Sequence, residues 1–471
     1  MKYISTCVLI INFCRRFEED VEVSNYREAY QSKLVSPDEA VKTVKSGDWI
    51  SYGSLNGQAN SLDKALTKRK EELRDVKVWT LLCLQIPEFV KVDPNGESFC
   101  CQSWHFSGVD RKIAKQGIPI YYTPMRYTEV PRYIREEVEP IQVAMLETAP
   151  MDKKGFFNFG PQNSHNKAVC DRADKVIVEV NTNMPRCLGG YHEAVHISGV
   201  DYIVEGENEP MITTAVSPPS EVDKMVAQHI VAKIEDGACI QLGIGSMANA
   251  VGQLICESDL KDLGCHTEML CDSYVDLFES GKLNGRMKNL NPGKMVYSFA
   301  LGSQQLYDFI DDNPRCAAYP VDYTNRVSVA SRNDRLMSIN NAVEIDIYGQ
   351  ICSETSGTQH ISGTGGQLDF VLAAYESSGG KSFICLPSTH KGKDGNLASC
   401  IVPTLPAGAI VTDPRAVAQY IVTEYGIFCS KGKTTWQKAE GIISLAHPNF
   451  RDDLVRAAQE QKIWSRYNKQ F

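Results

Sequence analysis

The stretch IEDGACIQLG, from Ile234 to Gly243, decides the fold of this chain. Its first glycine ends a helix-compatible segment, and the short apolar run Ala238–Leu242 that follows predicts a strand. The stretch VKSGDWISYG, from Val44 to Gly53, has the same pattern 190 residues earlier (234 minus 44). With so long a period the repeating unit is a whole domain, which predicts two related halves.

The length of 471 residues also favours two domains, because an ordinary domain has about 100–200 residues. The turn-rich sequence VSPPS at 216–220 predicts the junction between them. We therefore expect an N-terminal domain over 25–217 and a C-terminal domain over 218–471.

Residues 1–24 are predicted to be an extension outside both domains. Met1–Phe17 mimics a signal peptide, but its apolar run is short, and Arg15 and Arg16 follow where a small-residue cleavage site is required. We expect a disordered extension or a start-site artefact rather than an export signal.

Apolar runs typical of buried strands alternate with helix-compatible stretches along both halves. This alternation predicts an α/β fold made of two tandem open α/β domains with mainly parallel sheets. Ligands of such sheets bind beyond the carboxyl ends of the strands, where Gly243–Met247 would lie. The runs that predict further strands are 76–81, 175–180, 294–299, 336–347 and 381–386.

The composition excludes several classes of partner. A net charge of -9 and a pI near 5.6 argue against nucleic acid and anionic membranes, which need a basic surface. No segment approaches the roughly 20 apolar residues of a membrane span. The sixteen cysteines contain no C-x-x-C pair and often lie in apolar runs, which indicates reduced, buried thiols and a cytoplasmic location.

A glycine-rich turn and a lone acidic residue form the candidate site. The turn GIGSMA begins at Gly243, and Glu268 follows about 20 residues later, a spacing also seen in dinucleotide sites. The acid could hold a ribose, or it could be the nucleophile of a covalent acyl transfer. The dinucleotide interpretation is weakened because Leu263–Thr267, which precedes Glu268, is short and polar for a strand.

Two other motifs are less specific. His192-Glu193-Ala194-Val195-His196 matches the spacing of zinc proteases, but the glycines around it leave no room for the helix that this motif requires. The dense glycines of Ser362–Phe370 leave backbone N–H groups open to a ligand, as an oxyanion hole requires. The basic loop Ser388–Gly395 is normally solvated, although its lysines could meet a phosphate or a carboxylate.

Together these segments resemble the class I CoA-transferases of the acetyl-CoA hydrolase/4-hydroxybutyrate CoA-transferase group. The resemblance runs from about Tyr26 nearly to the C-terminus, with motifs in the same order and spacing. Narrower matches resemble the bacterial butyryl-CoA:acetate CoA-transferases of this group. The broad matches are 241–251, 266–269 and 363–370, and the narrow ones are 158–161, 183–190, 320–325 and 422–426.

The resemblance implies that Glu268 attacks an acyl-CoA and becomes a glutamyl-CoA thioester, which a short-chain carboxylate then opens in ping-pong fashion. A carboxylate with an unperturbed pKa of about 4.3 is ionised at neutral pH without a helper base. The implied oxyanion donors are the amides of Ile244, Gly365 and Gly366. Positions implied to contact CoA are Gly243, Ile244, Gly245, Ser246, Met247, Asn340, Val343, Gly366 and Lys393.

The resemblance further implies acyl-CoA and short-chain carboxylates as partners, with butyryl-CoA and acetate favoured. It implies no metal and no tightly bound cofactor, because CoA is itself the substrate moiety. A homo-oligomer is the usual expectation. The alternatives are a 4-hydroxybutyrate CoA-transferase, an acetyl-CoA hydrolase and, more distantly, an NAD-dependent oxidoreductase or a non-catalytic ligand sensor.

Overall fold

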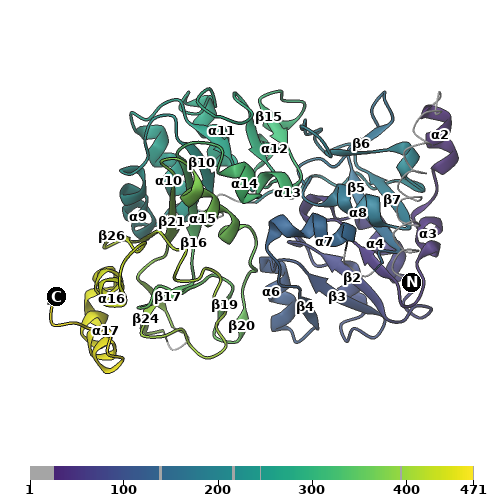
Figure 1. Cartoon of the computed structure of the whole chain (residues 1–471). Coiled ribbons are helices and arrows are strands. Elements are labelled where there is room, and N and C mark those ends of the chain that lie inside the picture. Colours follow the sequence, from purple (N-terminus) through teal and green to yellow (C-terminus); the bar gives the residue numbers. More distant parts are fainter. Residues whose placement is uncertain (1–25, 137–139, 215–217, 244, 393–394, 470–471) are drawn as a thin grey trace, which may run out of the picture.

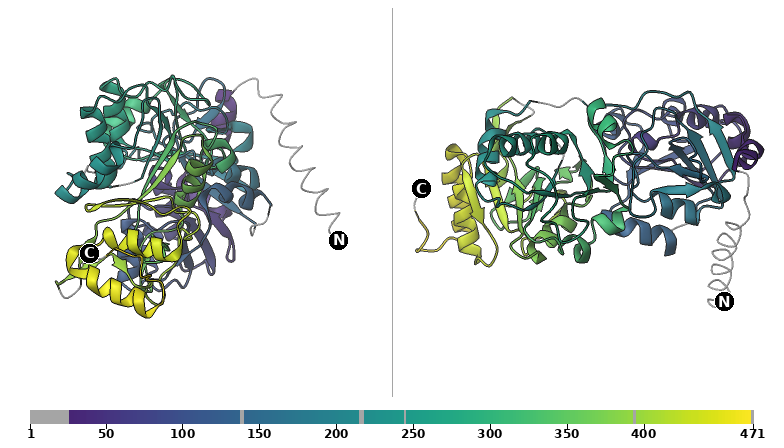
Figure 2. Two further views of the ribbon diagram at one scale, coloured as in Figure 1. Left: turned by 60° about the vertical axis from the view of Figure 1, so that its left-hand side comes forward. Right: turned by 90° about the horizontal axis from the view of Figure 1, so that it is seen from above.

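A computed structural model describes residues 26–136, 140–214, 218–243, 245–392 and 395–469. The chain forms two lobes that lie side by side, the first part of the chain in one and the second part in the other (Figure 1). The view from above shows the same two lobes (Figure 2).

The N-terminal lobe contains a seven-stranded sheet in the order β4-β3-β2-β1-β5-β7-β9. All neighbouring strands in it are parallel, and the central ones are buried. These strands are β1 (Trp49–Ser51), β2 (Val76–Thr80), β3 (Phe99–Ser103), β4 (Ile120–Tyr122), β5 (Val143–Thr148), β7 (Lys175–Val180) and β9 (Tyr202–Glu205).

The C-terminal lobe contains an eight-stranded sheet in the order β15-β13-β11-β10-β16-β21-β25-β26. Only its last pair is antiparallel. These strands are β10 (Cys239–Leu242), β11 (Gly264–His266), β13 (Met295–Tyr297), β15 (Cys316–Ala318), β16 (Leu336–Asn341), β21 (Lys381–Cys385), β25 (Tyr420–Thr423) and β26 (Gly426–Cys429).

The two sheets repeat one topology, which confirms the predicted fold class. In each, the first strand is central, the next three large-sheet strands extend to one side, and the following three extend to the other, where the C-terminal sheet has β26 as an additional antiparallel edge strand. The two central strands, β1 and β10, are equivalent, and each lies in one of the two repeated stretches. Equivalent positions of the two sheets can therefore be compared through their registers.

Helices connect the strands, and two further helices lie at the outer end of the C-terminal lobe (Figure 2). The helices of the first lobe are α2 (Tyr26–Lys33), α3 (Pro37–Ala40), α4 (Asn60–Thr67), α5 (Glu88–Val92), α6 (Gly108–Lys115), α7 (Val130–Glu136) and α8 (Asn166–Arg172). Those of the second are α9 (Glu221–Val231), α10 (Ser246–Glu257), α11 (Asp272–Glu279), α12 (Gln304–Ile310), α13 (Val321–Thr324), α14 (Val327–Ala330), α15 (Gln367–Glu376), α16 (Thr435–Ser444) and α17 (Pro448–Glu460).

Small ladders decorate both sheets. In two of them, short strands come soon after strands of the large C-terminal sheet. They are formed by β6 (Phe156–Asn158) with β8 (Ala194–His196), β12 (Met269–Leu270) with β14 (Phe299–Ala300), β17 (Glu344–Asp346) with β18 (Ile351–Cys352) and β24 (Ile401–Val402), β19 (Thr355–Ser356) with β20 (Gln359–His360), and β22 (Thr389–Lys391) with β23 (Leu397–Ser399).

Two strand predictions were wrong in detail. The run 336–347 is not one strand: β16 ends at Asn341, and β17 leaves the large sheet to pair with β18 and β24. The amide of Val343 donates to Cys352 across this break, which places Val343 in the connection. The segment before Glu268, predicted to be too polar for a strand, contains the fully buried β11 beside β10. Tertiary burial outweighed local polarity there.

Ser220 caps α9 with a capping box, directly after the proline-rich turn. Two other local predictions are confirmed. The segment with His192 and His196 is not helical, because His192 has a φ of 62° and β8 ends at His196. Among the described residues, all cysteines are free thiols and most are buried.

The boundaries of the two domains and of the N-terminal extension stay predictions. Residues 215–217, next to the proposed junction at 217/218, and the proposed extension 1–24 lie outside the described residues. In the part of the chain that is described, no helix is long and apolar enough to cross a membrane.

Candidate active site

The carboxyl ends of the two large sheets face a shared cavity of about 610 Å³. From the N-terminal lobe, it is lined by Leu81–Leu84 after β2 and by Trp104–Ser107 after β3. From the C-terminal lobe, it is lined by Gly243 after β10 and by Glu268 after β11. Both lobes therefore contribute to the site. In each lobe the lining residues lie beyond the carboxyl ends of the strands, where ligands of open α/β sheets bind.

The wall from the N-terminal lobe is mainly apolar. Trp104 is 6% exposed and lies among leucine and methionine side chains, while His105, Arg111 and Lys112 add polar groups on the same side of the cavity. The apolar part of this wall suits an acyl chain. Apolar residues that line it are Leu55, Leu81, Leu82, Leu84, Trp104, Met125 and Val130.

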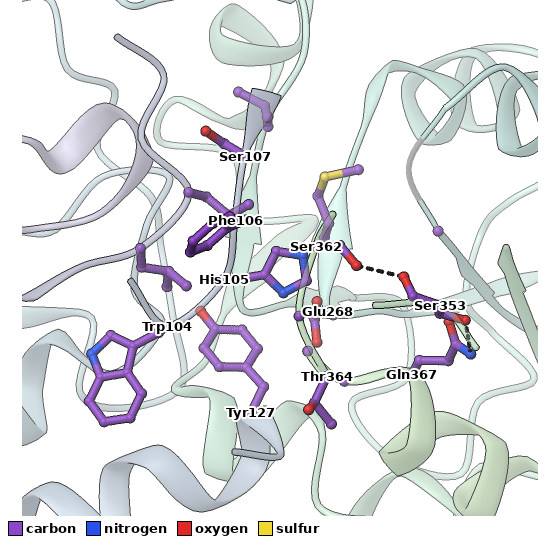
Figure 3. A pocket seen from close by; sticks show the side chains of 18 of the residues that line it. Trp104, His105, Phe106, Ser107, Tyr127, Glu268, Ser353, Ser362, Thr364 and Gln367 are labelled. Atoms are coloured by element: carbon purple, nitrogen blue, oxygen red, sulfur yellow. Dashed lines mark hydrogen bonds between the residues drawn. The ribbon is translucent and has the colours of Figure 1, made fainter. Parts of the chain in front are cut away.

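Glu268 lies where β11 gives way to β12, and its backbone is held on one side. Its carbonyl oxygen accepts hydrogen bonds from the amides of Ser298 at 2.9 Å and Phe299 at 3.1 Å. Its two neighbours are also held, because the amide of Thr267 donates to the carbonyl of Val296 and Met269 begins β12. The Glu268 side chain consequently projects into the cavity from a rigid frame (Figure 3).

The carboxylate of Glu268 accepts hydrogen bonds from neutral donors. The side-chain amide of Asn325 donates to Oε2 at 2.5 Å, and the backbone amide of Gly366 donates to the same carboxylate. A Cβ atom on Gly366 would lie 2.0 Å from Glu268 Oε2 and 2.1 Å from Asn325 Nδ2. Only glycine permits this approach. Within the described residues, no cation forms an ion pair with Glu268.

The electrostatics of the site correct one expectation. Burial raises the pKa of Glu268 to about 7, and the hydrogen bonds from Asn325 and Gly366 only partly oppose this. An unperturbed glutamate was predicted, but desolvation without a cationic partner favours the neutral form. Burial also raises the pKa of nearby Asp369 to about 8, against the effect of Arg126. Near neutrality the site therefore carries little fixed negative charge.

The loop that carries Gly366 is clamped by the N-terminal lobe. The amide of Phe106 donates to the carbonyl of Ser362, and the amide of Tyr127 donates to the carbonyl of Gly365, both at 3.0 Å. The hydroxyl of Tyr122 accepts from the Thr364 amide at 2.8 Å. Figure 3 shows this loop passing between Glu268 and residues of the other lobe.

The predicted glycine-rich turn lies at the carboxyl end of the central strand β10. Gly243 lines the cavity, and its amide donates to Ile339 at 2.9 Å. Gly245 has a φ of 112°, which requires glycine, and is the N-cap of α10. Ser246 begins α10, whereas the Met247 side chain is buried in the core and does not line the cavity.

A comparison of the two repeats shows how the α10 terminus differs. In the N-terminal lobe, the first-turn amides of Ser61 and Leu62 in α4 both donate to the Glu179 carboxylate at 3.0 Å. Cys385 of β21 stands at the matching register position of the C-terminal sheet. Within the described residues, no side chain caps the first turn of α10, so its amides are available to an external anion.

The remaining predicted residues divide into two groups. Asn340 and Val343 line the cavity, and Asn340 is held by hydrogen bonds to Gln241 and Ser338. Gly365 lines it as well, with a φ of 52°. Ile244 and Lys393 lie outside the described residues, so their predicted roles remain predictions.

The sequence did not predict two residues of the site, one that contacts Glu268 and one that lines the cavity. Asn325 is the last residue of the quoted motif 320–325, but a single asparagine carries no signal of its role. His105 lines the cavity from the N-terminal lobe. It lies 163 residues before Glu268 (268 minus 105), and no spacing pattern connects them.

The arrangement suits covalent chemistry at a carbonyl group. A carboxylate in a water-poor cavity is a nucleophile, and fixed N–H groups beside it can stabilise the oxyanion formed when it attacks. The position of Glu268 after a second strand would also suit a dinucleotide site. However, its carboxylate is bonded to Asn325 and Gly366.

Comparison with known proteins distinguishes these alternatives. Residues 19–218 match the acetyl-CoA hydrolase/transferase N-terminal domain, and residues 302–458 match the C-terminal domain. The chain is 52% identical to a butyryl-CoA:acetate CoA-transferase of Anaerostipes caccae over 94% of this chain and all of that protein. It is 37% identical to a 4-hydroxybutyrate coenzyme A transferase of Clostridium kluyveri over 91% of this chain and 98% of that one.

A comparison of folds also relates the chain to a solved structure. The crystal structure of RipA from Yersinia pestis superposes with a TM-score of 0.85 at 34% identity, covering 93% of this chain and 100% of that one. Two domain matches, extensive sequence identity and a shared fold agree with the position of Glu268. The chain therefore belongs to the acetyl-CoA hydrolase/transferase family.

Proposed function

We propose that this protein is an acyl-CoA:acetate CoA-transferase that converts butyryl-CoA and acetate to butyrate and acetyl-CoA. The observation that carries the proposal is the Glu268 carboxylate, held by Gly366 and Asn325 at an apolar cavity between two sheets. The 52% identity to the Anaerostipes caccae enzyme supports this choice of substrates.

The proposed reaction begins with attack of a Glu268 carboxylate oxygen on the thioester carbonyl carbon. A C–O bond forms, the C–S bond breaks, and CoA leaves as the thiolate. The thiolate then attacks the glutamyl carbonyl of the mixed anhydride and expels butyrate, which leaves a glutamyl-CoA thioester. Acetate opens this thioester to a second anhydride, and the thiolate takes the acetyl group and frees Glu268.

The supporting residues are proposed as follows. The amide of Gly366, with those of Gly365 and Ile244, would stabilise the tetrahedral oxyanions. The open turn at Gly243 and the first-turn amides of α10 would receive CoA. The further CoA contacts proposed are Gly245, Ser246, Met247 through its amide, Asn340, Val343 and Lys393. CoA serves as the substrate moiety, so the steps proposed here use no bound cofactor.

The apolar part of the wall supports a preference for butyryl over acetyl groups. A butyryl chain has two methylenes more than an acetyl chain, and each buried methylene contributes about 0.8 kcal/mol. If both are buried between Leu84 and Trp104, the expected discrimination is about tenfold.

Mass spectrometry of the intact protein tests the covalent mechanism. After incubation with butyryl-CoA and no acceptor, the mass is expected to rise by one CoA less one water, and peptide mapping should place the adduct on Glu268. Addition of acetate should remove the adduct and yield acetyl-CoA. The control is a Glu268→Gln protein, which should acquire no adduct.

Two other results would contradict the proposal. Steady release of CoA into water, without an adduct and without acetyl-CoA, would indicate an acyl-CoA hydrolase. Binding of NAD(H) without any CoA release would restore the dinucleotide interpretation.

The raised pKa of Glu268 predicts a pH dependence of the first half-reaction. Only the carboxylate form attacks, and the pKa in the free protein is about 7. The rate of thioester formation from butyryl-CoA should therefore rise with pH and level off above 7, and fall about tenfold for each pH unit below it. Quenched-flow mass spectrometry between pH 5 and pH 9, a range of about two units on each side, measures this rate.

The second half-reaction provides an internal control. In the glutamyl-CoA thioester the Glu268 carboxyl group is esterified to sulfur and no longer titrates, so opening by acetate should not show the inflection near 7. An identical inflection in both half-reactions would assign it to another group.

A further inference from the structure

His105 is a histidine of the N-terminal lobe that faces the site without a structural partner. It follows β3, lines the cavity, and projects from the opposite lobe toward Glu268 (Figure 3). Within the part of the chain that the structure describes, its ring makes no hydrogen bond or ion pair. A half-buried imidazole of this kind has its N–H group and its lone pair available to a ligand.

The His105 ring lies against the glycine loop that carries Gly366. A Cβ atom on Gly363 would lie 2.9 Å from His105 Nδ1, and one on Gly365 would lie 3.3 Å from its Cε1. The glycines therefore make room for the ring as well as for Glu268. The ring and Gly366 therefore lie along one loop and line the same cavity.

The surroundings keep this imidazole neutral. Burial lowers the pKa of His105 to about 4, and the nearby charges of His360 and Arg111 lower it further in the same direction. Arg111 itself donates to the carbonyl of Ile361 at 2.6 Å and stays beside the loop. A neutral imidazole donates one hydrogen bond and cannot form an ion pair with Glu268.

We propose that the neutral N–H group of His105 donates a hydrogen bond to the acyl oxygen of the substrate and makes His105 a catalytic residue. The inference rests on the proposed function. When Glu268 attacks, the π pair of the acyl C=O moves to that oxygen, and it returns as the C–S bond breaks and CoA leaves. His105 keeps its proton throughout. The same oxygen then belongs to the released carboxylate.

This role separates the two carbonyl groups of the reaction. The Gly366 amide already donates to the carboxylate of Glu268, so it is placed for the glutamyl carbonyl. The acyl carbonyl lies beyond it, toward the N-terminal lobe, where His105 supplies a donor. A protonated histidine would instead pair with Glu268 and reduce its nucleophilicity, so a neutral donor suits the step better.

The test compares two replacements of His105. His105→Phe keeps a planar ring but has no donor, whereas His105→Gln keeps an N–H group. Single-turnover rates of glutamyl-CoA formation from butyryl-CoA, and of acetyl-CoA formation from glutamyl-CoA and acetate, are measured for both, because each includes attack on an acyl carbonyl. We expect both steps to slow about 100-fold in the phenylalanine variant and only about tenfold in the glutamine variant. Tyr121→Phe, an exposed substitution on β4, serves as the control with wild-type rates.

Folding is checked by the thermal midpoint, which should stay within about 4 °C of the wild type in both variants. Single-turnover rates of the His105→Phe protein within about threefold of the wild-type rates would overturn the role of His105. Equal slowing by phenylalanine and glutamine would also overturn it, because packing would then explain the loss. A wild-type protein that forms no adduct would overturn the proposed function, and the role of His105 with it.

Discussion

Replacing Glu268 with glutamine is expected to lower the rate of CoA transfer at least about 10⁴-fold, the scale seen when a covalent nucleophile is removed. The amide oxygen can still accept the hydrogen bonds from Asn325 and Gly366, so the site keeps its shape. Steady-state formation of acetyl-CoA from butyryl-CoA and acetate measures the loss.

The same substitution should not reduce stability, which distinguishes lost chemistry from lost folding. The folded-state pKa of Glu268, about 7, lies above its unfolded value of about 4.3, so the stability that its proton provides is lost as pH rises between these values. Glutamine is neutral throughout. The free energy of unfolding of Glu268→Gln relative to the wild type should therefore increase from pH 5 to pH 8 by an amount on the order of 3 kcal/mol, and thermal unfolding at the two pH values measures this change.

Glu268→Asp is the matched variant, because it keeps a carboxylate but draws it back by one methylene. A displacement of about 1 Å from the attacking position can cost about 100-fold, so intermediate activity is expected. If the Glu268→Gln and Glu268→Asp proteins transferred CoA at equal rates, this result would contradict the nucleophilic role of Glu268.

Replacing Gly366 with alanine is expected to lower transfer by about 100- to 1,000-fold, the range seen for loss of one oxyanion donor. The φ of Gly366 is -101°, which alanine adopts freely, so the effect comes from space alone. The new Cβ would lie 2.0 Å from Glu268 Oε2 and must displace the carboxylate or the loop. The single-turnover rate of adduct formation measures this effect.

Gly199→Ala is the control for this change. Its Cβ would make only an ordinary contact, 3.5 Å from Val195, and Gly199 does not line the cavity. Wild-type adduct formation is expected. If Gly366→Ala also forms the adduct within about tenfold of the wild-type rate, close approach of glycine to Glu268 is not required for attack.

The sequence was sufficient to predict the fold because its decisive signals are local. Each repeated stretch ends a helix, turns at glycine and begins a buried strand, and these features need no knowledge of distant contacts. The strand at 336–347 was predicted too long, because its break depends on β17 pairing with β18 and β24. Pairing between distant segments leaves no local pattern.

The site was predictable only in part for the same reason. Glu268 and Gly366 belong to glycine-rich or motif-bearing segments, and the structure brings them together. Asn325 and His105 reach the site through the packing of other elements. The raised pKa of Glu268 depends on its burial in the folded protein, which the local sequence around Glu268 does not show.

The carboxylate that occupies the end of α4 has a consequence for how a substrate lies in the cleft. The carboxyl group of Glu179 caps the first turn of α4 in the N-terminal lobe, whereas no described side chain caps the matching helix α10. A pseudo-symmetric cleft could otherwise accept an elongated molecule in either of two orientations. Because the N-terminus of α4 is already capped, we expect the phosphate-bearing end of the substrate to point to the C-terminal lobe and the acyl end to the apolar wall. In this single orientation the acyl group reaches the one carboxyl group at Glu268.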